Sequence, residues 1–347
     1  MSAAAAEAAI LAPEPPGPVE PASPPTISIV VPAYEAAKTV AEAVASALEQ
    51  DPPPHEVIVA DDGSRDEIAD ALARFADRIT LLREPHRGVA AARNAGWRAA
   101  SGDFVLYADA DDVVLPGKIA ALRRLGRERP DLDLLATDMF FERDDQPAGR
   151  FGEVNAFPLA DQRTEVLRRC FVVQPAFRRS RLREVGGFDE ELHSAVDWDC
   201  ILRLVLSGST AGLYDAPLAV YRIHDNSLAS ARVQSLGDRV RLLEKASRSS
   251  DLRPDERPAL EASLALQRER TQLAEAQAAV TTAERGARGR CLRLALTRGN
   301  SARVRAWGLG IALLPGRLSW WTRRGFAEPS QLSRNLPVGP RSEQTRY

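Results

Sequence analysis

Two patterns of apolar residues alternate along the first half of the chain. Continuous apolar runs such as ISIVV, VIVA and FVLY are typical of strands that are buried on both faces of a sheet. Between the first two runs, Val40, Val44, Ala47 and Leu48 recur at the spacing of an amphipathic helix. Strands that alternate with helices of this length predict an α/β fold with a parallel, doubly wound sheet.

Polar residues follow these strands at the point where each strand ends. The second run, VIVA, ends in ADDGS, residues 60–64. FVLY, the fourth predicted strand after one near ITLLRE, is followed by ADADD, which contains Asp109, Asp111 and Asp112. In open α/β sheets, ligands bind in the crevice beyond the carboxyl ends of the strands. We therefore expect both acidic clusters to border one site.

The three acids after the fourth strand suit a divalent cation. Mg²⁺ and Mn²⁺ take oxygen ligands, usually one or two carboxylates together with substrate phosphates. Asp109 and Asp111 face the same way if the chain stays extended, and without a cation each pair of acids would repel by about 1 kcal/mol at 4 Å in water. The alternatives are a solvated loop or a helix N-cap at Asp112, and an Asx turn at Asp61 to Gly63.

The sequence predicts three regions that differ in composition and in secondary-structure pattern. Residues 1–25 are rich in proline and alanine and lack a basic, apolar signal sequence, which indicates a disordered leader. Residues 26–230 contain the strands and helices of the main domain, although the pattern is less regular after residue 131. Residues 231–347 read as a helical, arginine-rich C-terminal extension.

The charge of the chain is unevenly distributed. The formal net charge is -2, yet residues 281–347 contain thirteen arginines against three glutamates. The segment around residues 303–325 contains an uncharged stretch, residues 306–316, with arginines on both sides. It also contains Trp307, Trp320 and Trp321. This combination suits peripheral contact with an anionic membrane, and a basic helical lid packed on the main domain is the alternative.

The cysteines and the hydropathy of the chain indicate in which cellular compartment the protein works. The three cysteines are far apart and have no CxxC spacing, which favours a reducing, cytoplasmic compartment, and none is expected to be catalytic. No apolar stretch approaches eighteen residues, so we expect no transmembrane helix. The protein is therefore predicted to be cytoplasmic, with the inner face of the membrane as its place of peripheral contact.

Several of these motifs together resemble a known family. The stretches VVPAYE, VIVADDGSRD, HRGVAAARNAGWRAASGDFVLYADADDVVLPG, VGGFDEEL and VDWDCILRL occur in the order and spacing of family 2 glycosyltransferases. The match covers about residues 26–225. It implies the GT-A fold, a Rossmann-like, mostly parallel doubly wound sheet that binds a nucleoside-diphosphate sugar.

The resemblance implies a donor site at the ends of the strands. The residues at its nucleotide-binding positions are Pro32, Tyr34, Glu35, Asp61, Asp62, Gly88, Arg93, Asn94 and Asp109. Asp109 and Asp111 match the DxD element, which implies that they hold Mn²⁺ or Mg²⁺ and the diphosphate. His224 matches a position that approaches this metal, and a structural histidine is the alternative.

The resemblance also implies a catalytic base and an acceptor side. Asp197 matches the general base of inverting members, although Val196 stands where an acid usually precedes that base. The residues at acceptor-side positions are Gly187, Phe188, Asp189, Trp198 and Asp199. The acceptor implied is a hydroxyl of a glycan or lipid-linked glycan in polysaccharide or cell-envelope biosynthesis, and no nucleic acid partner is expected.

Two other functions fit parts of the sequence. FVLYADADDVV also satisfies the DxD strand signature of haloacid-dehalogenase-like phosphatases, with Asp109 as the nucleophile and Asp111 as the acid/base. That class needs a lysine and a second acidic pair downstream, whereas ADDGS lies upstream. A non-catalytic nucleotide-sugar-binding scaffold is the other alternative, against which both Asp111 and Asp197 are present.

Overall fold

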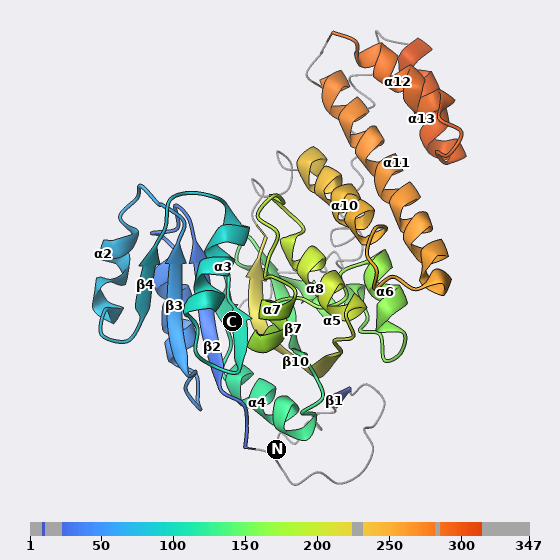
Figure 1. Ribbon diagram of the computed structural model, residues 1–347. Helices are drawn as coiled ribbons and strands as arrows, with labels where there is room; N and C mark the ends of the chain where they lie inside the picture. The colour runs from blue at the N-terminus through green and yellow to red at the C-terminus, as the bar shows by residue number, and fades with distance from the viewer. Residues whose placement is uncertain (1–8, 11–22, 224–231, 282–284, 314–347) are drawn as a thin grey trace, which may run out of the picture. The chain divides into compact units, whose positions relative to one another are not determined.

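The computed structural model describes residues 9–10, 23–223, 232–281 and 285–313 (Figure 1). These residues divide into two compact units. Unit 1 contains the chain up to Leu192 together with residues 196–223, and unit 2 contains residues 193–195 and the helices from residue 232 to residue 313. The boundaries predicted for the leader, the main domain and the extension remain predictions, although Ala9 and Ile10 of the leader pair with Tyr214 and Leu213.

Unit 1 alternates strands and helices along most of its length. Its elements are β1 (Ala9–Ile10), β2 (Ile27–Ala33), α1 (Val40–Leu48), β3 (Glu56–Asp61), α2 (Ile68–Leu72), the 3-10 helix η1 (Ala73–Phe75), β4 (Thr80–Arg83), α3 (Val89–Ala99), β5 (Phe104–Tyr107), β6 (Val113–Val114), α4 (Lys118–Glu128), β7 (Leu134–Arg143), β8 (Gln146–Arg150), α5 (Phe151–Val154), α6 (Gln162–Arg168), β9 (Ala176–Arg178), α7 (Arg179–Glu184), α8 (Val196–Leu206) and β10 (Ala211–Arg222).

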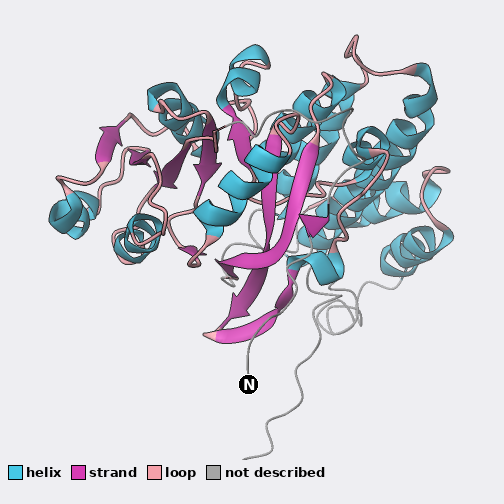
Figure 2. Ribbon diagram, turned by 90° about the horizontal axis from the view of Figure 1, so that it is seen from below, coloured by secondary structure: helices cyan, strands magenta, loops and turns pink. Residues whose placement is uncertain are grey.

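The strands of unit 1 form one mixed sheet in the order β1-β10-β7-β9-β5-β2-β3-β4. The four strands at one end, β5-β2-β3-β4, are all parallel, and β7 and β10 form a second parallel pair. Between these groups β9 runs antiparallel to both of its neighbours. The predicted doubly wound, mostly parallel α/β sheet is confirmed, with helices on both of its faces (Figure 2).

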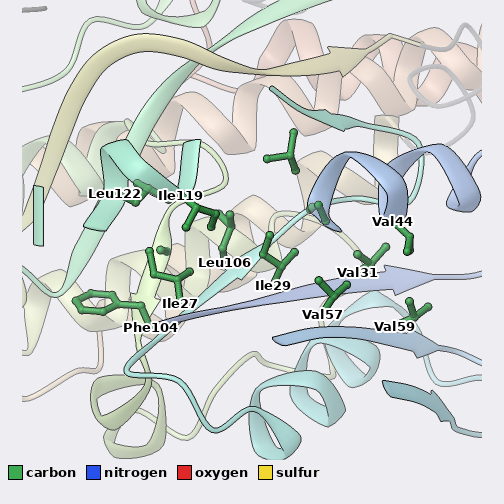
Figure 3. Close-up of a cluster of buried hydrophobic side chains, with 14 of the residues drawn as sticks. Ile27, Ile29, Val31, Val44, Val57, Val59, Phe104, Leu106, Ile119 and Leu122 are labelled. Atoms are coloured by element: carbon green, nitrogen blue, oxygen red, sulfur yellow. The ribbon is translucent and has the colours of Figure 1, made fainter. Parts of the chain in front are cut away.

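The main core lies on one face of the sheet (Figure 3). Alternate residues of β2, Ile27, Ile29 and Val31, point into this core and are almost completely buried. The cluster also takes apolar side chains from β3, β5, α1, α2 and α4. The period of two in the strands therefore meets the period of 3.6 in the helices, as the sequence pattern predicts.

The opposite face of β2 packs against α3. A Cβ atom added to Gly96 of α3 would lie 2.2 Å from Cγ1 of Val30, so only glycine permits this close approach. The contact matters for function because α3 also carries Arg93 and Asn94, which are both buried. The spacing between α3 and β2 thus fixes two of the predicted site residues.

Unit 2 is helical, as predicted for the C-terminal extension. Its elements are α10 (Arg232–Ala246), the 3-10 helix η2 (Pro254–Glu256), α11 (Arg257–Thr281), α12 (Ala287–Leu296) and α13 (Ala302–Leu313). Leu273, Cys291, Leu294 and Ile311 form a small core that joins α11, α12 and α13. Within the described residues, none of the helices is both long and apolar enough to cross a membrane.

Candidate active site

The predicted acidic cluster lies directly after β5, at the carboxyl end of the central strands. Asp109 and Asp111 are partly exposed, whereas Asp112 is buried, and its amide donates to the carbonyl oxygen of Asp109 at 3.0 Å. Burial and the nearby carboxylates of Asp109 and Asp111 raise the pKa of Asp112 to about 8. The three acids therefore share one crowded electrostatic environment, which a cation would relieve.

Arg93 of α3 joins the acidic cluster to α8. Its guanidinium donates to Oδ1 of Asp197 at 2.7 Å and to Oδ1 of Asp109 at 3.1 Å. Although burial opposes the charge, Asp197 and Asp109 raise the pKa of Arg93 further above its ordinary value. The guanidinium also lies 5.7 Å from the ring centroids of Tyr107 and Phe188, on which a cation is stabilised. Arg93 therefore fixes two carboxylates that are 88 residues apart in the sequence.

Asp197, the predicted base, lies in the first turn of α8. Its side chain keeps 42% of its surface exposed, so a substrate can reach it. Desolvation raises the pKa of Asp197, Arg93 opposes this rise, and Asp109 adds to it. A higher pKa strengthens a carboxylate as a proton acceptor.

Two residues that the sequence analysis missed also lie near the acids. Lys118, at the start of α4, is buried, and burial lowers its pKa to about 8 against the opposing effect of Asp112 and Asp109. Burial, followed by the nearby carboxylates, raises the pKa of Tyr221 on β10 to about 12. The only available signals were the position of Lys118 just after LPG and of Tyr221 just before His224.

Asp112 connects the acidic loop to the rest of unit 1. Its carboxylate accepts hydrogen bonds from the Gln174 side-chain amide and, at 3.1 Å, from the backbone amide of Arg222. The Arg222 side chain in turn contacts Glu42 at 2.7 Å and Glu142 at 3.1 Å. These contacts assign Asp112 to holding the loop and leave Asp109 and Asp111 as the better-placed ligands.

An aromatic pair lies at the ends of β2 and β4. The ring of Tyr34, 44% exposed, stacks on the ring of His86 with centroids 4.1 Å apart. Nδ1 of His86 lies 2.8 Å from Oδ2 of Asp62, and Asp62 also accepts from the amides of Arg87 and Gly88, each at 2.8 Å. Asp62 and Gly88, which were both predicted to bind nucleotide, thus shape the loop beside this exposed aromatic surface.

The other predicted nucleotide-binding residues of this region lie close by. Pro32 is buried in β2 beside Ala60, and Glu35 accepts from the amide of Arg65 at 2.9 Å. Oδ1 of Asp61 accepts from the amide of Ser64 at 2.9 Å, while its buried Oδ2 has no hydrogen bond and lies 3.2 Å from Nε of Arg83. Asp61 is therefore held at the end of β3 by Ser64 and Arg83.

Asn94 links α3 to the loop that follows α7 through hydrogen bonds. Its amide group donates to the carbonyl of Phe188 and to Glu190, both at 2.9 Å. Its oxygen accepts from the amide of Phe188 at 2.9 Å and from the indole of Trp97 at 3.0 Å. Protein groups therefore occupy all the hydrogen-bonding positions of Asn94, which suits a positioning role better than the predicted contact with nucleotide.

Most of the predicted acceptor-side residues are buried and make their polar contacts with other protein groups. Phe188 is buried among Tyr107 and Phe177, and Trp198 is buried with its indole donating to the carbonyl of Val166 at 2.6 Å. Asp199 is buried and pairs with Arg203 at 2.6 Å.

The same arginine fixes the predicted acceptor loop. Arg203 donates to the carbonyls of Val185 at 2.6 Å and Gly187 at 2.7 Å. Asp189 is half-buried, and its carboxylate accepts from the amide of Glu191 at 3.0 Å. Of the predicted acceptor-side residues, Asp189 is thus the most accessible, whereas Gly187, Phe188, Trp198 and Asp199 are buried.

The metal ligands predicted from the sequence are only partly placed. His224 lies outside the described residues, so its predicted role stays a prediction. Among the residues that the structure describes, no three of the histidine, cysteine, aspartate or glutamate side chains are grouped as a metal site. Asp109 and Asp111 supply two carboxylates, the number that Mg²⁺ commonly uses when substrate phosphates supply other ligands.

Comparisons with known proteins match part of the chain to one family. Residues 28–186 match the model of glycosyl transferase family 2. The succinoglycan biosynthesis protein ExoU of Rhizobium meliloti is 31% identical over 208 residues, which are 54% of this chain and 59% of that protein. Chondroitin synthase of Pasteurella multocida is 29% identical over 187 residues, which are 52% of this chain and 19% of that enzyme. The chain therefore spans only part of the length of these relatives.

Solved structures share the fold. Residues 1–349 of S. aureus TarS in complex with UDP-GlcNAc align with a TM-score of 0.59 at 17% identity, covering 83% of this chain and 89% of that chain. The mannosyltransferase PcManGT from Pyrobaculum calidifontis, in complex with GDP-Man and Mn²⁺, aligns with a TM-score of 0.55 at 21% identity, covering 86% and 91%. The predicted GT-A fold is thereby confirmed.

Proposed function

From the match of residues 28–186 to glycosyl transferase family 2, we propose that the protein transfers a sugar from a nucleoside-diphosphate sugar to a hydroxyl group of a glycan or glycolipid. One observation carries the proposal. Arg93 holds Asp109, in the acidic cluster after β5, and Asp197, on α8, on opposite sides of one guanidinium. Asp109, which would help to bind the diphosphate, and Asp197, which would accept the proton of the acceptor hydroxyl, would thus both lie close to the transferred sugar.

The donor would occupy the carboxyl ends of β2, β3 and β5. The Tyr34 and His86 pair offers a flat surface for a nucleobase, and Asp62, whose carboxylate lies 2.8 Å from Nδ1 of His86, would lie beside that base. The ligands bound in two solved structures of the same fold, UDP-GlcNAc in TarS and GDP-Man in PcManGT, support a donor of this class. The DxD aspartates then lie where the diphosphate follows the base and ribose along the strand ends.

Asp109 and Asp111 would hold a divalent ion, Mn²⁺ or Mg²⁺. The oxygen donors and the crowding that raises the pKa of Asp112 fit such an ion. When bound, the ion would neutralise negative charge on the departing diphosphate. Arg93 keeps Asp109 in place, and Asp112 holds the loop through Gln174 and Arg222.

Asp197 would remove the proton from the attacking acceptor hydroxyl. It is half-exposed, hydrogen-bonded to Arg93, and has a raised pKa, all of which suit a general base. The new glycosidic bond would form as the bond to the diphosphate breaks, with the proton on Asp197. A single displacement of this kind inverts the anomeric centre.

The rim beside Asp197 would receive the acceptor. Gly187 and Asp189 belong to a loop that Asn94 and Arg203 fix from two sides. Polysaccharide biosynthesis in the cell envelope is the proposed process, which the similarity to a succinoglycan biosynthesis protein and to a chondroitin synthase supports. The proposal also places the protein in the cytoplasm, with peripheral contact at the inner face of the membrane, where lipid-linked acceptors lie.

The alternative functions have no support from these comparisons. A phosphatase of the haloacid-dehalogenase type would use Asp109 as a nucleophile, yet Asp109 is paired with Arg93 at 3.1 Å. A non-catalytic scaffold would have no use for the contact between Arg93 and Asp197 at 2.7 Å.

A thermal-shift screen tests the donor site. Purified protein would be heated with UDP, GDP, dTDP or CMP, each with Mn²⁺, Mg²⁺ or a chelator. We expect one nucleotide to raise the melting temperature only with metal, and Asp111→Asn to remove that rise. Asp145→Asn, an exposed acid in the turn between β7 and β8, serves as the control. A rise that is the same with chelator would contradict the metal-dependent site.

A further inference from the structure

Helices α12 and α13 expose a concentration of large apolar side chains. The described chain has nine exposed large hydrophobic residues, and four of them lie on these two helices. Leu296 and Leu313 are each 68% exposed, Leu309 is 46% exposed and Leu292 is 43% exposed. We name these four residues the leucine face. Scattered exposed leucines need no explanation, but a group of four in so short a segment marks an interaction surface.

The leucines are regularly placed on their helices. Leu292 and Leu296 are four residues apart and so lie on one side of α12. On α13, Ala302, Ala306, Leu309 and Leu313 follow one another at steps of four, three and four residues, and all are exposed. Each helix therefore presents a continuous apolar stripe outside the contact between α12 and α13, which lie together at the end of the chain's described part (Figure 1).

The later turns of α13 are apolar on every side. Residues 306–313 read AWGLGIAL and contain no charged or polar side chain. One side is covered, because Gly308 packs against the backbone of Cys291 and Ile311 joins the small core of unit 2. A helix that is apolar all round is normally buried all round, so the uncovered side calls for an apolar partner.

The segment that carries the leucine face is strongly basic, and the one acidic side chain recorded against it, Glu269 of α11, accepts from the amide and hydroxyl of Ser301. Residues 285–313 contain seven arginines and no acidic residue: Arg285, Arg288, Arg290, Arg293, Arg298, Arg303 and Arg305. Arg288, Arg293 and Arg298 are exposed. Exposed leucines in a segment with this excess of arginine complement a surface with an apolar interior and anionic groups at its edge.

We propose that the leucine face inserts into an anionic lipid surface while the surrounding arginines contact the lipid head groups. Helix α13 has 12 residues, whereas about 20 are needed to span a bilayer, so the helices would lie in the interface. Membrane binding would bring the protein to a lipid-linked acceptor, and this purpose, although not the binding itself, rests on the proposed function.

Vesicle flotation of the full chain tests this inference without donor or acceptor. The probes are vesicles of phosphatidylcholine alone and vesicles with about a third phosphatidylglycerol. We expect binding only to the anionic vesicles and weakening by salt, because the arginine contacts are screened. The leucine-face variant carries Leu292→Ser, Leu296→Ser, Leu309→Ser and Leu313→Ser, and its affinity should fall by about tenfold or more. The matched control is Leu266→Ser, which changes a leucine on α11 that is 44% exposed.

A charge variant keeps the test decisive if the leucine-face variant does not fold. It carries Arg288→Gln, Arg293→Gln and Arg298→Gln, and each substitution should weaken binding about fivefold. Its control combines Arg127→Gln and Arg183→Gln, two exposed arginines of unit 1, and should bind as the wild type does.

Three results would overturn the inference. They are equal binding to both kinds of vesicle, unchanged binding of the leucine-face and charge variants, and a dimer that the leucine substitutions dissociate without any vesicle binding. The last result would assign the leucine face to a second copy of the chain. Nucleotide-dependent thermal shifts, measured on the same samples, report separately on the proposed function.

Discussion

Replacing Asn94 by alanine should destabilise unit 1 substantially. The substitution removes four hydrogen bonds of 2.9 to 3.0 Å, which link α3 to Phe188 and Glu190 and to the indole of Trp97. Three of these bonds are to neutral partners, worth about 1 kcal/mol each, and a bond to a carboxylate is worth about 1.5–3 kcal/mol. Glu190 keeps 34% of its side chain exposed, so its share must be reduced. We expect the free energy of unfolding to fall by about 3–5 kcal/mol.

The assay is urea unfolding followed by fluorescence, combined with a titration of the cognate nucleoside diphosphate. A positioning role predicts a large loss of stability, because Asn94 is almost completely buried. A direct nucleotide contact, as the family resemblance implies, predicts weaker nucleotide binding with unchanged unfolding. Trp97→Phe is the comparison, since it removes the bond at 3.0 Å and part of a buried ring but keeps the other three bonds of Asn94, and it should cost about 2 kcal/mol, less than Asn94→Ala. A loss below about 1 kcal/mol in Asn94→Ala would refute this reasoning.

Two further predictions test the loop and the thiols. Gly187→Ala would place a Cβ atom 2.5 Å from Oδ1 of Asn94 at a residue with φ of 77°, whereas Gly186→Ala, with φ of 80°, meets nothing within 4 Å. Urea unfolding should show a loss of about 1–2 kcal/mol for Gly186→Ala and a clearly larger loss for Gly187→Ala, and equal losses would contradict the steric account. Burial raises the pKa of the Cys200 thiol to about 12, so native protein at neutral pH should react with a maleimide at Cys170 before Cys200. Peptide mapping by mass spectrometry checks this order, and early labelling of Cys200 would show that α8 opens readily.

The strands, helices and acidic strand ends of the first half could be predicted because their signals are local. Ile27, Ile29 and Val31 alternate with a period of two, and a buried strand needs no knowledge of distant partners. The same reasoning places Asp109 and Asp111 at the carboxyl edge of the sheet. It also predicts the mostly parallel arrangement, although not that β9 runs antiparallel to β5 and β7.

The supporting contacts could not be predicted because they depend on tertiary structure. Asn94 and Phe188 are 94 residues apart, and no periodic pattern relates them. Lys118 lies in a sequence context that is typical of an exposed helix start, yet it is buried beside the acidic cluster. Asp199 matches an acceptor-side position in the family, but its pairing with Arg203 became visible only in the structure.

The most direct test of the central proposal is to measure nucleoside diphosphate release from a panel of UDP-, GDP- and dTDP-sugars, with metal and an extract of cell-envelope glycans. The wild type should release the nucleotide from one donor class. Asp197→Asn should lower kcat by about 10² to 10⁴-fold while nucleotide affinity stays within about twofold, because the proposed base acts on the acceptor. Equal rates in the two proteins would contradict the role of Asp197, and no release from any donor would contradict the proposed glycosyl transfer.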